Sequence, residues 1–397
     1  MSMISGMDVP ALWGCPVSNI LAWRCETDCR LMLLQVDERD PMGRWVLDRA
    51  EDGSQDEAPG LLDATDVLLF GNSHLGEEIS EWPATAQYLV KLLSPAGSIE
   101  ARSLYLGCGH GGKSKQSTWA PLLSVESGSG RVRMRHATIG FRGAWPDWLS
   151  IGAGPNLLDR LKVRARARFL LGLVRVERDE SHLQSRVVGW RVGPLRAIRA
   201  QEQWVFLGWG LRTPIMRAYA VFYPDHVEVP VAFRLRFPAT YFFSDIRIRA
   251  YADFRDLHGW VLLLPEDPAE YPIDGTMSAE ERGLRERNPE WFALRGATVT
   301  LVQVLTLSDS LRSVKRTFFF NDSLGAQSPP ESSAGELPGV GYELSDWQHV
   351  GAGLHTLQLV SFVVPNTVRP EDVVAAYRRP ATVQVLPLPS AVQSPRL

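Results

Sequence analysis

The sequence lacks the features that mark a membrane-spanning protein or a secreted precursor. No run of eighteen apolar residues occurs in its 397 residues, so no span of a membrane is expected. The segment from Met1 to Pro10 has neither a basic start nor an apolar stretch, so no signal peptide is expected in this sequence. Lysine is scarce, with five residues against 37 arginines, and the formal net charge is −3. A chain this close to neutral lacks the positive field that attracts nucleic acid, so no nucleic-acid partner is expected.

Common catalytic motifs are also missing. Neither H-E-x-x-H nor G-x-S-x-G occurs, and the eight histidines are widely spread. The densest acid–base group lies between Asp253 and His258. If this segment is a strand, Asp256 and His258 share a face and can act as a general acid–base pair. Alternatively, these two residues end the strand and cap the turn before Gly259.

Three of the four cysteines lie early in the chain. Cys25 and Cys29 flank a short turn between two predicted strands, and a disulfide across that turn is sterically feasible and typical of an exported protein. One alternative is a zinc site formed by Cys15, Cys25, Cys29 and Cys108, although the C-x-x-C pair of many zinc sites is absent. Free buried thiols are the other alternative.

The dominant pattern is alternation of apolar and polar residues. Segments 131–139, 162–169 and 245–251 alternate arginine with apolar residues, as strands with one solvated face do. Many other short apolar runs are separated by turn residues, whereas only segments 278–288 and 369–377 indicate helices. The pattern predicts an all-β fold, a large antiparallel β-sandwich of supersandwich type with one or two short helices. A change in composition near residues 144–155 predicts an N-terminal β segment over 1–145 and the main sandwich over 146–397.

The arginine-rich strands are candidate ligand-binding faces. The residues concerned are Arg131, Arg133 and Arg135 in one strand, and Arg164, Arg166 and Arg168 in another. Guanidinium groups recognise anions, and Trp145, Trp148, Trp204 and Trp209 can stack on sugars, so an acidic polysaccharide is the expected ligand. The alternative is a solvated sheet face whose arginines pair with neighbouring carboxylates.

One segment matches the phosphate-loop motif G-x-x-x-x-G-K-S, from Gly107 to Ser114. In nucleotide-binding proteins, backbone amides of this loop hold phosphates, the lysine contacts them, and the serine binds magnesium. The mechanism requires a helix starting at Lys113, but the following residues are poor helix formers and Pro121 comes soon after. The context therefore favours a glycine-rich connection between strands over a nucleotide site.

The region from Leu34 to Phe70 resembles a group of exported bacterial β-sandwich proteins. The shared pattern is a Gln-Val-Asp strand at Gln35, a Gly-Arg-Trp-Val-Leu-Asp segment from Gly43, and D-x-x-D-x-L-V-F from Asp63. The resemblance implies export to the periplasm or the exterior, an all-β fold, and a loop similar to half of an EF-hand. Aligned in this way, Glu57, Asp63 and Asp66 are the predicted calcium ligands, while Gln55 and Pro59 occupy two positions that calcium sites fill with oxygen donors. An acidic surface loop without metal is the alternative.

The sequence therefore supports three hypotheses of different classes. The first is an exported protein without catalytic activity that binds an anionic glycan or a partner protein. The second is a carbohydrate-active enzyme similar to polysaccharide lyases, with arginine and histidine or tyrosine in its site. The third, a nucleotide-binding protein, depends on the segment Gly107–Ser114 alone.

Overall fold

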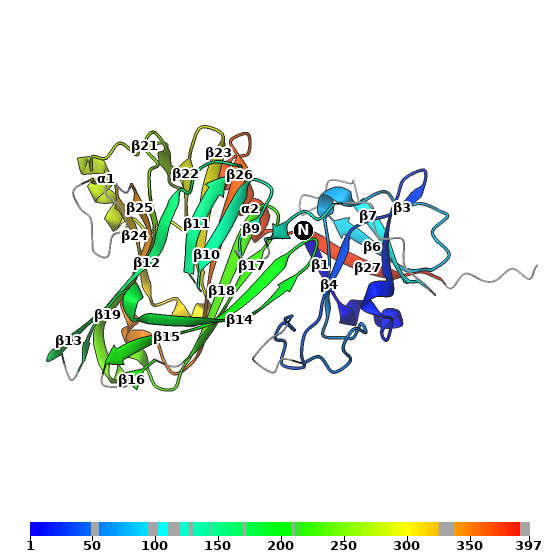
Figure 1. The fold of residues 1–397 in the computed structure, drawn as a ribbon, viewed down its shortest axis with the longest axis horizontal. Helices are drawn as coiled ribbons and strands as arrows, with labels where there is room; N and C mark the ends of the chain where they lie inside the picture. Colours follow the sequence, from blue (N-terminus) through cyan, green and yellow to red (C-terminus); the bar gives the residue numbers. More distant parts are fainter. Residues whose placement is uncertain are drawn as a thin grey trace, which may run out of the picture. The chain divides into compact units, whose positions relative to one another are not determined.

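The computed structural model describes residues 1–48, 55–93, 102–109, 120–126, 130–143, 145–169, 172–208, 211–213, 215–324 and 337–389 (Figure 1). The chain folds into two compact units. The first comprises residues 1–123, 190–197 and 375–397, and the second comprises residues 124–189 and 198–374. The sequence predicted a boundary between residues 145 and 146, but this position lies inside the second unit. There β10 (Ala137–Arg142) and β11 (Trp145–Ile151) pair as a hairpin. The change in composition at that point therefore accompanies a turn.

The first unit is a small sandwich of two antiparallel sheets. One sheet has the order β1 (Ser2–Ser5), β5 (Val67–Phe70), β4 (Leu34–Asp37). The other has the order β27 (Thr382–Pro387), β6 (Ala86–Leu93), β7 (Arg102–Cys108), β2 (Ile20–Cys25), β3 (Cys29–Leu31). Their facing side chains form one apolar core, in which Phe70 of the first sheet and Leu104 of the second are fully buried. The second sheet thus depends on a strand from the far end of the chain.

Two disulfides stabilise the first unit. Cys25 and Cys29 are bonded across the turn between β2 and β3, and Cys15 is bonded to Cys108 at the end of β7. All four cysteines are therefore oxidised, which leaves no thiolate for zinc and no free thiol. Closing the loop between Cys15 and Cys108 restricts the unfolded chain and so favours the folded state.

The second unit contains three antiparallel sheets. A ten-stranded sheet contains β14 (Leu183–Val192), β15 (Ala197–Gly208), β17 (Met216–Phe222), β18 (His226–Leu235), β26 (Gly353–Pro365), β23 (Val299–Leu307), β22 (Trp291–Arg295), β20 (Val261–Leu263) and β21 (Tyr271–Pro272) in this order, with β16 (Leu211–Arg212) beside β15. A five-stranded sheet has the order β13 (Val174–Arg178), β12 (Leu158–Phe169), β19 (Phe243–Phe254), β25 (Gly339–Ser345), β24 (Lys315–Asn321). A four-stranded sheet has the order β11, β10, β9 (Val132–Arg133), β8 (Ser124–Val125).

The ten-stranded sheet packs against the other two sheets of this unit. Phe292 on β22 contacts Phe318 and Tyr342 of the five-stranded sheet, with ring centroids 5.4 and 5.7 Å apart. Ala137 of the four-stranded sheet joins Val299 and Val363 of the ten-stranded sheet in a second apolar cluster. Tilted ring pairs and interdigitated aliphatic side chains of this kind contribute to the stability of packed sheets. The expected all-β fold with antiparallel sheets is therefore confirmed.

The described residues include two short α-helices, in agreement with the one or two expected from the sequence. α1 (Ala279–Gly283) begins at the capping box of Ser278 and Glu281 and continues as a 3₁₀ turn, η7 (Leu284–Glu286). α2 (Pro370–Arg378) begins with proline at its first position, where the missing N–H costs nothing. In the described part of the chain, no helix has the length and apolar character needed to cross a membrane.

Alternation within the five-stranded sheet determines which side chains face outward. On β12, Val163 and Ala165 face the core, while Arg164 and Arg166 lie on the opposite face, because successive strand residues point to opposite sides. Segment 131–139, expected as one strand, is instead a hairpin of β9 and β10 with a turn between Met134 and Ala137. An alternating pattern is compatible with either structure, because a tight hairpin reverses the chain without breaking the period.

Candidate functional site

The outer face of the five-stranded sheet carries a hollow of about 590 Å³ between its strands and α1. We call it the arginine hollow, because seven cationic and three carboxylate side chains are among its lining residues. The cations are Lys162, Arg164, Arg166, Arg247, Arg249, Arg282 and Arg285, and the carboxylates are Asp253, Glu281 and Glu343. Sequence reasoning identified Arg164 and Arg166 but missed the arginines of β19, although segment 245–251 shows the same alternation.

Strand pairing places arginines directly opposite one another. Arg164 on β12 faces Arg249 on β19, and Arg166 faces Arg247. Like charges at directly opposed positions repel, so the pairs need compensating anions. Arg164 is paired with Glu180, and Arg249 donates two hydrogen bonds, of 2.9 and 2.6 Å, to the same oxygen of Glu343.

The arginines nearer the rim of the face have looser partners. The Arg166 guanidinium is 3.3 Å from Glu177, and that of Arg247 is 3.1 Å from Asp245. Arg166 and Arg247 are both exposed. Arg168, the third residue of the predicted strand face, lies 3.7 Å from Asp245 and is outside the lining of the hollow. Exposed ion pairs are weak and exchange readily with another anion, so Arg166 and Arg247 are the cations best placed to bind a ligand.

The floor of the arginine hollow is formed by aromatic rings and bare backbone. A Cβ at the lining residue Gly339 would lie 3.3 Å from the Phe319 ring and 3.4 Å from the Tyr251 ring, so glycine leaves room for both rings. The rings of Tyr251 and Phe319 pack with centroids 4.6 Å apart, and the Arg249 guanidinium lies 4.4 Å above the Phe319 ring. Beneath them, Lys162 forms a buried ion pair with Asp253. The cation–π contact between Arg249 and Phe319 therefore lets an aromatic ring lie on a face that is otherwise charged.

Tyr251 is the candidate base in this hollow for a lyase-like reaction. Burial raises the pKa of the Tyr251 hydroxyl above its ordinary value of 10, and this effect outweighs the nearby cations Arg164 and Lys162. A general base works best with a pKa close to the operating pH. Tyr251 therefore stays protonated at neutral pH, so the surroundings favour binding over proton abstraction.

A second hollow, of about 790 Å³, lies between β10, β11 and the start of β12. We call it the tryptophan hollow, because Trp145 and Trp148 line it. The Arg131 guanidinium lies 3.9 Å above the Trp148 ring. Its other charged lining residues are Arg142, Arg160, Arg255, Asp147, Asp159 and Glu180. A ring and a guanidinium in one concave surface are suited to a sugar that carries an acidic group.

The two hollows share β12. Arg160 lines the tryptophan hollow, and Lys162, Arg164 and Arg166 line the arginine hollow. Glu180 of η5 (Glu180–His182) lines the tryptophan hollow and pairs with Arg164. At about 3.3 Å per strand residue, the distance from Arg160 to Arg166 is about 20 Å.

The remaining predicted ligand-binding residues lie outside both hollows. Arg133 is exposed, with Glu126 3.5 Å away, and Arg135 lies in the turn between β9 and β10. The structure therefore does not bring Arg131, Arg133 and Arg135 into one face, because the chain turns between them. Trp204 donates a 3.0 Å hydrogen bond to Gln184 away from either hollow, and Trp209 lies outside the described residues.

Asp256 and His258, the weak catalytic candidates, lie in a turn. The Asp256 carboxylate accepts a 3.0 Å hydrogen bond from the backbone N–H of His258, and both residues are exposed. Gly259 follows with a φ of +82°, which continues the turn. Asp256 therefore caps the turn, as in the second of the two alternatives drawn from the sequence. Neither Asp256 nor His258 is among the lining residues of either hollow.

The first unit contains a group of carboxylates that we call the acidic cluster, formed by Glu38, Asp56, Asp63 and Asp66. One oxygen from each of Asp56, Asp63 and Asp66 lies within 4.8 Å of the others, and Glu38 is near Asp56. Asp63 and Asp66 were predicted ligands, but the third member is Asp56, whereas the predicted Glu57 is exposed and is not among the three.

Burial dominates the electrostatics of the acidic cluster. It raises the pKa of Asp66 to about 7, against hydrogen bonds from the backbone N–H groups of Asp63 and Arg39. Burial likewise raises the pKa of Asp56 to about 6, and the charges of Asp63 and Glu38 add to the effect. Burial therefore disfavours the charged form of both carboxylates.

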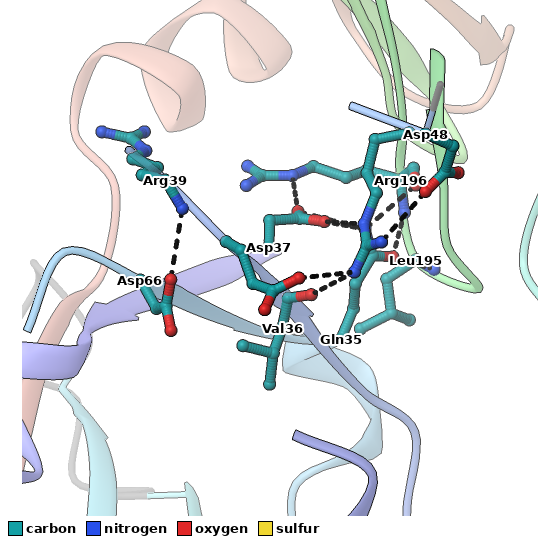
Figure 2. A network of polar contacts seen from close by, with 10 residues as sticks. Gln35, Val36, Asp37, Arg39, Asp48, Asp66, Leu195 and Arg196 are labelled. Carbon is teal, nitrogen blue, oxygen red and sulfur yellow. Dashed lines mark hydrogen bonds and ion pairs between the residues drawn. The ribbon is translucent and has the colours of Figure 1, made fainter. Parts of the chain in front are cut away.

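A buried polar network lies beside the acidic cluster and explains the sequence pattern of the region (Figure 2). The Gln35 amide accepts hydrogen bonds from the backbone of Leu195 and Arg196 and donates to Asp37, and Arg196 Nε donates to Asp37 at 2.5 Å. Figure 2 also shows the backbone N–H of Arg39 donating to Asp66. The guanidinium groups of Arg39 and Arg196 lie 3.8 and 4.4 Å from the centroid of the Trp45 ring.

This network gives the shared motif a structural role. A Cβ at Gly193 would lie 2.2 Å from the Gln35 side chain, so glycine is needed for the contact. Asp48 pairs with Arg191 at 3.2 Å. The Gln-Val-Asp and Trp-Val-Leu-Asp segments are therefore joined to the Gly193–Arg196 turn by side-chain contacts.

The phosphate-loop segment begins at the end of β7. Gly107 approaches the Thr85 carbonyl so closely that a Cβ would lie 1.9 Å from its oxygen, and Cys108 is bonded to Cys15. His110 to Ser114 lie outside the described residues. β7 is flanked by antiparallel neighbours, β6 and β2, whereas a phosphate loop follows a strand of a parallel βαβ unit.

Comparisons with known proteins inform the fold. No protein-family model matches the sequence, and no curated protein matches it. The structure is similar to the crystal structure of an α-mannosidase from Enterococcus faecalis V583, with a TM-score of 0.50 and 9% sequence identity. The match covers 97% of this chain but 42% of that protein, so this chain spans less than half the length of its structural neighbour. At this identity the likeness concerns the β-rich fold alone.

Proposed function

We propose that this protein binds an acidic polysaccharide outside the cytoplasm along the face that joins the arginine and tryptophan hollows. The observation that carries the proposal is the excess of cations in the arginine hollow, where seven cationic side chains face three carboxylates among the described lining residues. Uronic-acid and sulfated polysaccharides present anionic groups at regular intervals. Guanidinium groups form charge-assisted, often bidentate hydrogen bonds with such groups.

The arrangement of charge favours an extended ligand. Arg166 and Arg247 are exposed, and their partners Glu177 and Asp245 are exposed as well, so an incoming carboxylate displaces only weak pairs. Arg249 is held by Glu343 and stacks on Phe319, so it contributes a fixed charge near the floor. A surface about 20 Å long suits an oligosaccharide better than a single sugar.

The tryptophan hollow supplies the apolar component of sugar recognition. Trp145 and Trp148 offer flat faces for the C–H groups of a pyranose ring, and Arg131 above Trp148 offers a charge for its carboxylate. The fold of the α-mannosidase neighbour supports a carbohydrate-related origin for the sandwich. The two disulfides support a location in the periplasm or outside the cell, because disulfides persist in oxidising compartments.

The proposal favours binding over catalysis. Asp256 and His258 lie in an exposed turn, and Tyr251 is protonated at neutral pH. The lyase alternative would gain support if the purified protein released unsaturated products from polygalacturonate, which absorb in the ultraviolet.

Binding to polygalacturonate and alginate tests the proposal, with neutral dextran as the control polymer. Isothermal titration of oligomers should give measurable affinity for the two acidic polymers, decreasing as salt is added because the arginines are exposed. The double variant Arg166→Ala/Arg247→Ala should weaken binding by about tenfold or more, the effect of losing charged hydrogen bonds. Arg133→Ala is the matched control, because Arg133 is an exposed arginine outside both hollows.

Two results would overturn the proposal. One is equal binding of dextran and of the acidic polymers, or no binding of any of them. The other is an equal loss of affinity in Arg133→Ala and in the double variant, which would mean that the arginine hollow is not the site.

A further inference from the structure

We propose that the acidic cluster of the first unit is a binding site for a hard divalent cation, calcium in the first place. Asp56, Asp63 and Asp66 supply the central oxygens, and Glu38 lies beside Asp56. The inference does not depend on the proposed polysaccharide site, which belongs to the second unit.

Chain geometry brings these residues together from three short segments. Glu38 follows β4, Asp66 precedes β5, and these two strands are paired in one sheet. Asp63 and Asp66 are held three residues apart by a turn, in which the backbone N–H of Asp63 donates a 3.0 Å hydrogen bond to Asp66. The Glu38 carboxylate accepts a hydrogen bond of 2.5 Å from the backbone N–H of Gly60, which anchors the segment between Asp56 and Asp63.

Asp56 gives an independent indication of a ligand. Asp56 is only 7% exposed, and its Oδ2 atom receives no hydrogen bond from a donor among the described residues. Its Oδ1 atom accepts a long hydrogen bond of 3.4 Å from the backbone N–H of Ala58, and the neighbouring Glu38 carboxylate can bond Asp56 only when the two share a proton. Burying a carboxylate oxygen without a hydrogen-bond donor costs free energy. A cation bound at this position would offset that cost.

The charges that act on the cluster are those of its own carboxylates. Asp63 and Glu38 act on Asp56, and Asp63 and Asp56 act on Asp66. Glu38 has one distant partner, Arg191, at 3.9 Å. Arg39 contributes its backbone N–H to Asp66, while its guanidinium stacks on Trp45.

The donor set indicates the class of metal. The cluster offers carboxylate oxygens and contains no histidine or cysteine, and oxygen donors suit calcium and magnesium better than zinc or copper. Calcium accepts six to eight oxygens in irregular geometry, and it tolerates a mixture of carboxylates, backbone carbonyls and water. Magnesium demands a nearly ideal octahedron, so a cluster assembled from three segments favours calcium.

Bound calcium would stabilise the first unit, because a ligand that binds only the folded state raises its stability. The cation would connect the segment after β4 to the turn before β5. The hydrogen bonds from Gln35 and Arg196 to Asp37 also hold the end of β4, where the first of these segments begins.

The test begins with the wild-type protein stripped of metal by chelation and dialysis. Calcium chloride should bind in isothermal titration calorimetry and raise Tm by several degrees, excess chelator should reverse the shift, and magnesium chloride should have a smaller effect. Absence of both calcium binding and a Tm shift in the stripped protein would overturn the proposal.

Variants then assign the ligands. Asp56→Asn and Asp63→Asn should each weaken calcium binding by about tenfold or more, because each removes a charged oxygen donor. Glu57→Gln is the matched control, since Glu57 is an exposed acid next to Asp56 and should leave the calcium affinity unchanged. Equal losses in Glu57→Gln and Asp56→Asn would overturn the assignment of the site.

The stability of the variants without metal separates metal binding from misfolding. In chelator, Asp56→Asn should have a Tm equal to or above that of the wild type, because it removes repulsion between carboxylates. An Asp56→Asn protein that is less stable in chelator, together with unchanged calcium binding by Asp63→Asn, would show a structural role and refute the metal site.

Discussion

The arginine hollow and the acidic cluster concentrate charge of opposite sign by different means. In the arginine hollow, strand alternation places Arg164 and Arg166 on one face, and strand pairing places Arg249 and Arg247 opposite them. In the acidic cluster, Asp56, Asp63 and Asp66 come from turns with no period. A regular strand thus repeats a charge at a spacing that the sequence reveals, whereas a cluster of turns depends on the path of the backbone.

The two regions also differ in how their charge is compensated. Arg164 and Arg249 have close carboxylate partners, and the exposed arginines have looser ones. Asp56 and Asp66 instead receive backbone N–H groups, and their pKa values are raised by burial. Excess positive charge at a surface is screened by water, whereas excess negative charge in a buried cluster requires a bound cation or proton.

The largest effect is expected from Arg196→Ala, which tests how much the buried network beside the acidic cluster depends on the cation that pairs with Asp37. Asp37 and Arg196 are both 1% exposed, and the variant leaves Asp37 with its hydrogen bonds from the Gln35 amide and a distant cation, Arg191, at 3.8 Å. Removing one partner of a buried pair costs about 3–5 kcal/mol. Urea denaturation followed by Trp fluorescence should show this loss, with Arg133→Ala as control, and a loss below about 1 kcal/mol would contradict the proposed dependence.

Lys162→Met should be the next most damaging change, and it tests the buried part of the arginine hollow. Lys162 is 1% exposed and pairs with Asp253, which is itself buried. The variant leaves that carboxylate without its cation, at a cost of about 3 kcal/mol in the free energy of unfolding. The double variant Lys162→Met/Asp253→Leu should recover much of the loss. Failure to recover would mean that the packing of Lys162, not its charge, is what matters.

Asp322→Asn tests whether a fully buried acid of the second unit behaves like the acids of the acidic cluster. Burial raises its pKa to about 6, so the folded state binds a proton more tightly than the unfolded state, whose pKa is near 4. The stability due to this proton is complete below about pH 4 and is lost as pH rises through about 6.

Asparagine keeps an oxygen to accept from the backbone N–H groups of Asp274 and Gly275, which bond Asp322 at 2.8 and 3.1 Å. Relative to wild type, the variant should therefore gain about 1–3 kcal/mol between pH 4 and pH 8. Denaturation at the two pH values checks this difference. A variant equally destabilised at both pH values would show that its effect comes from lost packing or hydrogen bonding and not from the proton that Asp322 binds.

The smallest effect on stability is expected from Arg166→Ala. The side chains of Arg166 and Glu177 are 60% and 51% exposed and 3.3 Å apart, so the pair should contribute less than about 1 kcal/mol. A thermal melt should therefore resemble that of the wild type, while the affinity for polygalacturonate falls. A large loss of stability would mean that the exposed arginines hold the sheet together instead of serving a ligand.

Much of the fold could be predicted from local patterns. The alternation in segments 162–169 and 245–251 predicted β12 and β19, and the capping box at Ser278 and Glu281 predicted the start of α1. These features follow from contacts between residues close in sequence. The same reasoning misread segment 131–139, because the period alone does not distinguish one strand from two that turn back on each other.

The candidate sites could be predicted only in part. Arg164 and Arg166 were identified, but their alignment with Arg249 and Arg247 depends on the pairing of strands about eighty residues apart. Asp63 and Asp66 were identified from the resemblance, but Asp56 entered the cluster in place of Glu57. In a turn, neighbouring side chains point in different directions, so an error of one residue exchanges a buried carboxylate for an exposed one.

The sequence by itself determined the all-β class, the charged faces of the strands and the start of α1, because strand period and helix capping are local properties of the chain. Only the tertiary structure decided the division into two units, the pairing of Cys15 with Cys108, and the meeting of Asp56 with Asp63 and Asp66. These features depend on which distant segments pack together. That choice is made by the burial of apolar surface and by backbone hydrogen bonding over the whole chain, which no local pattern records.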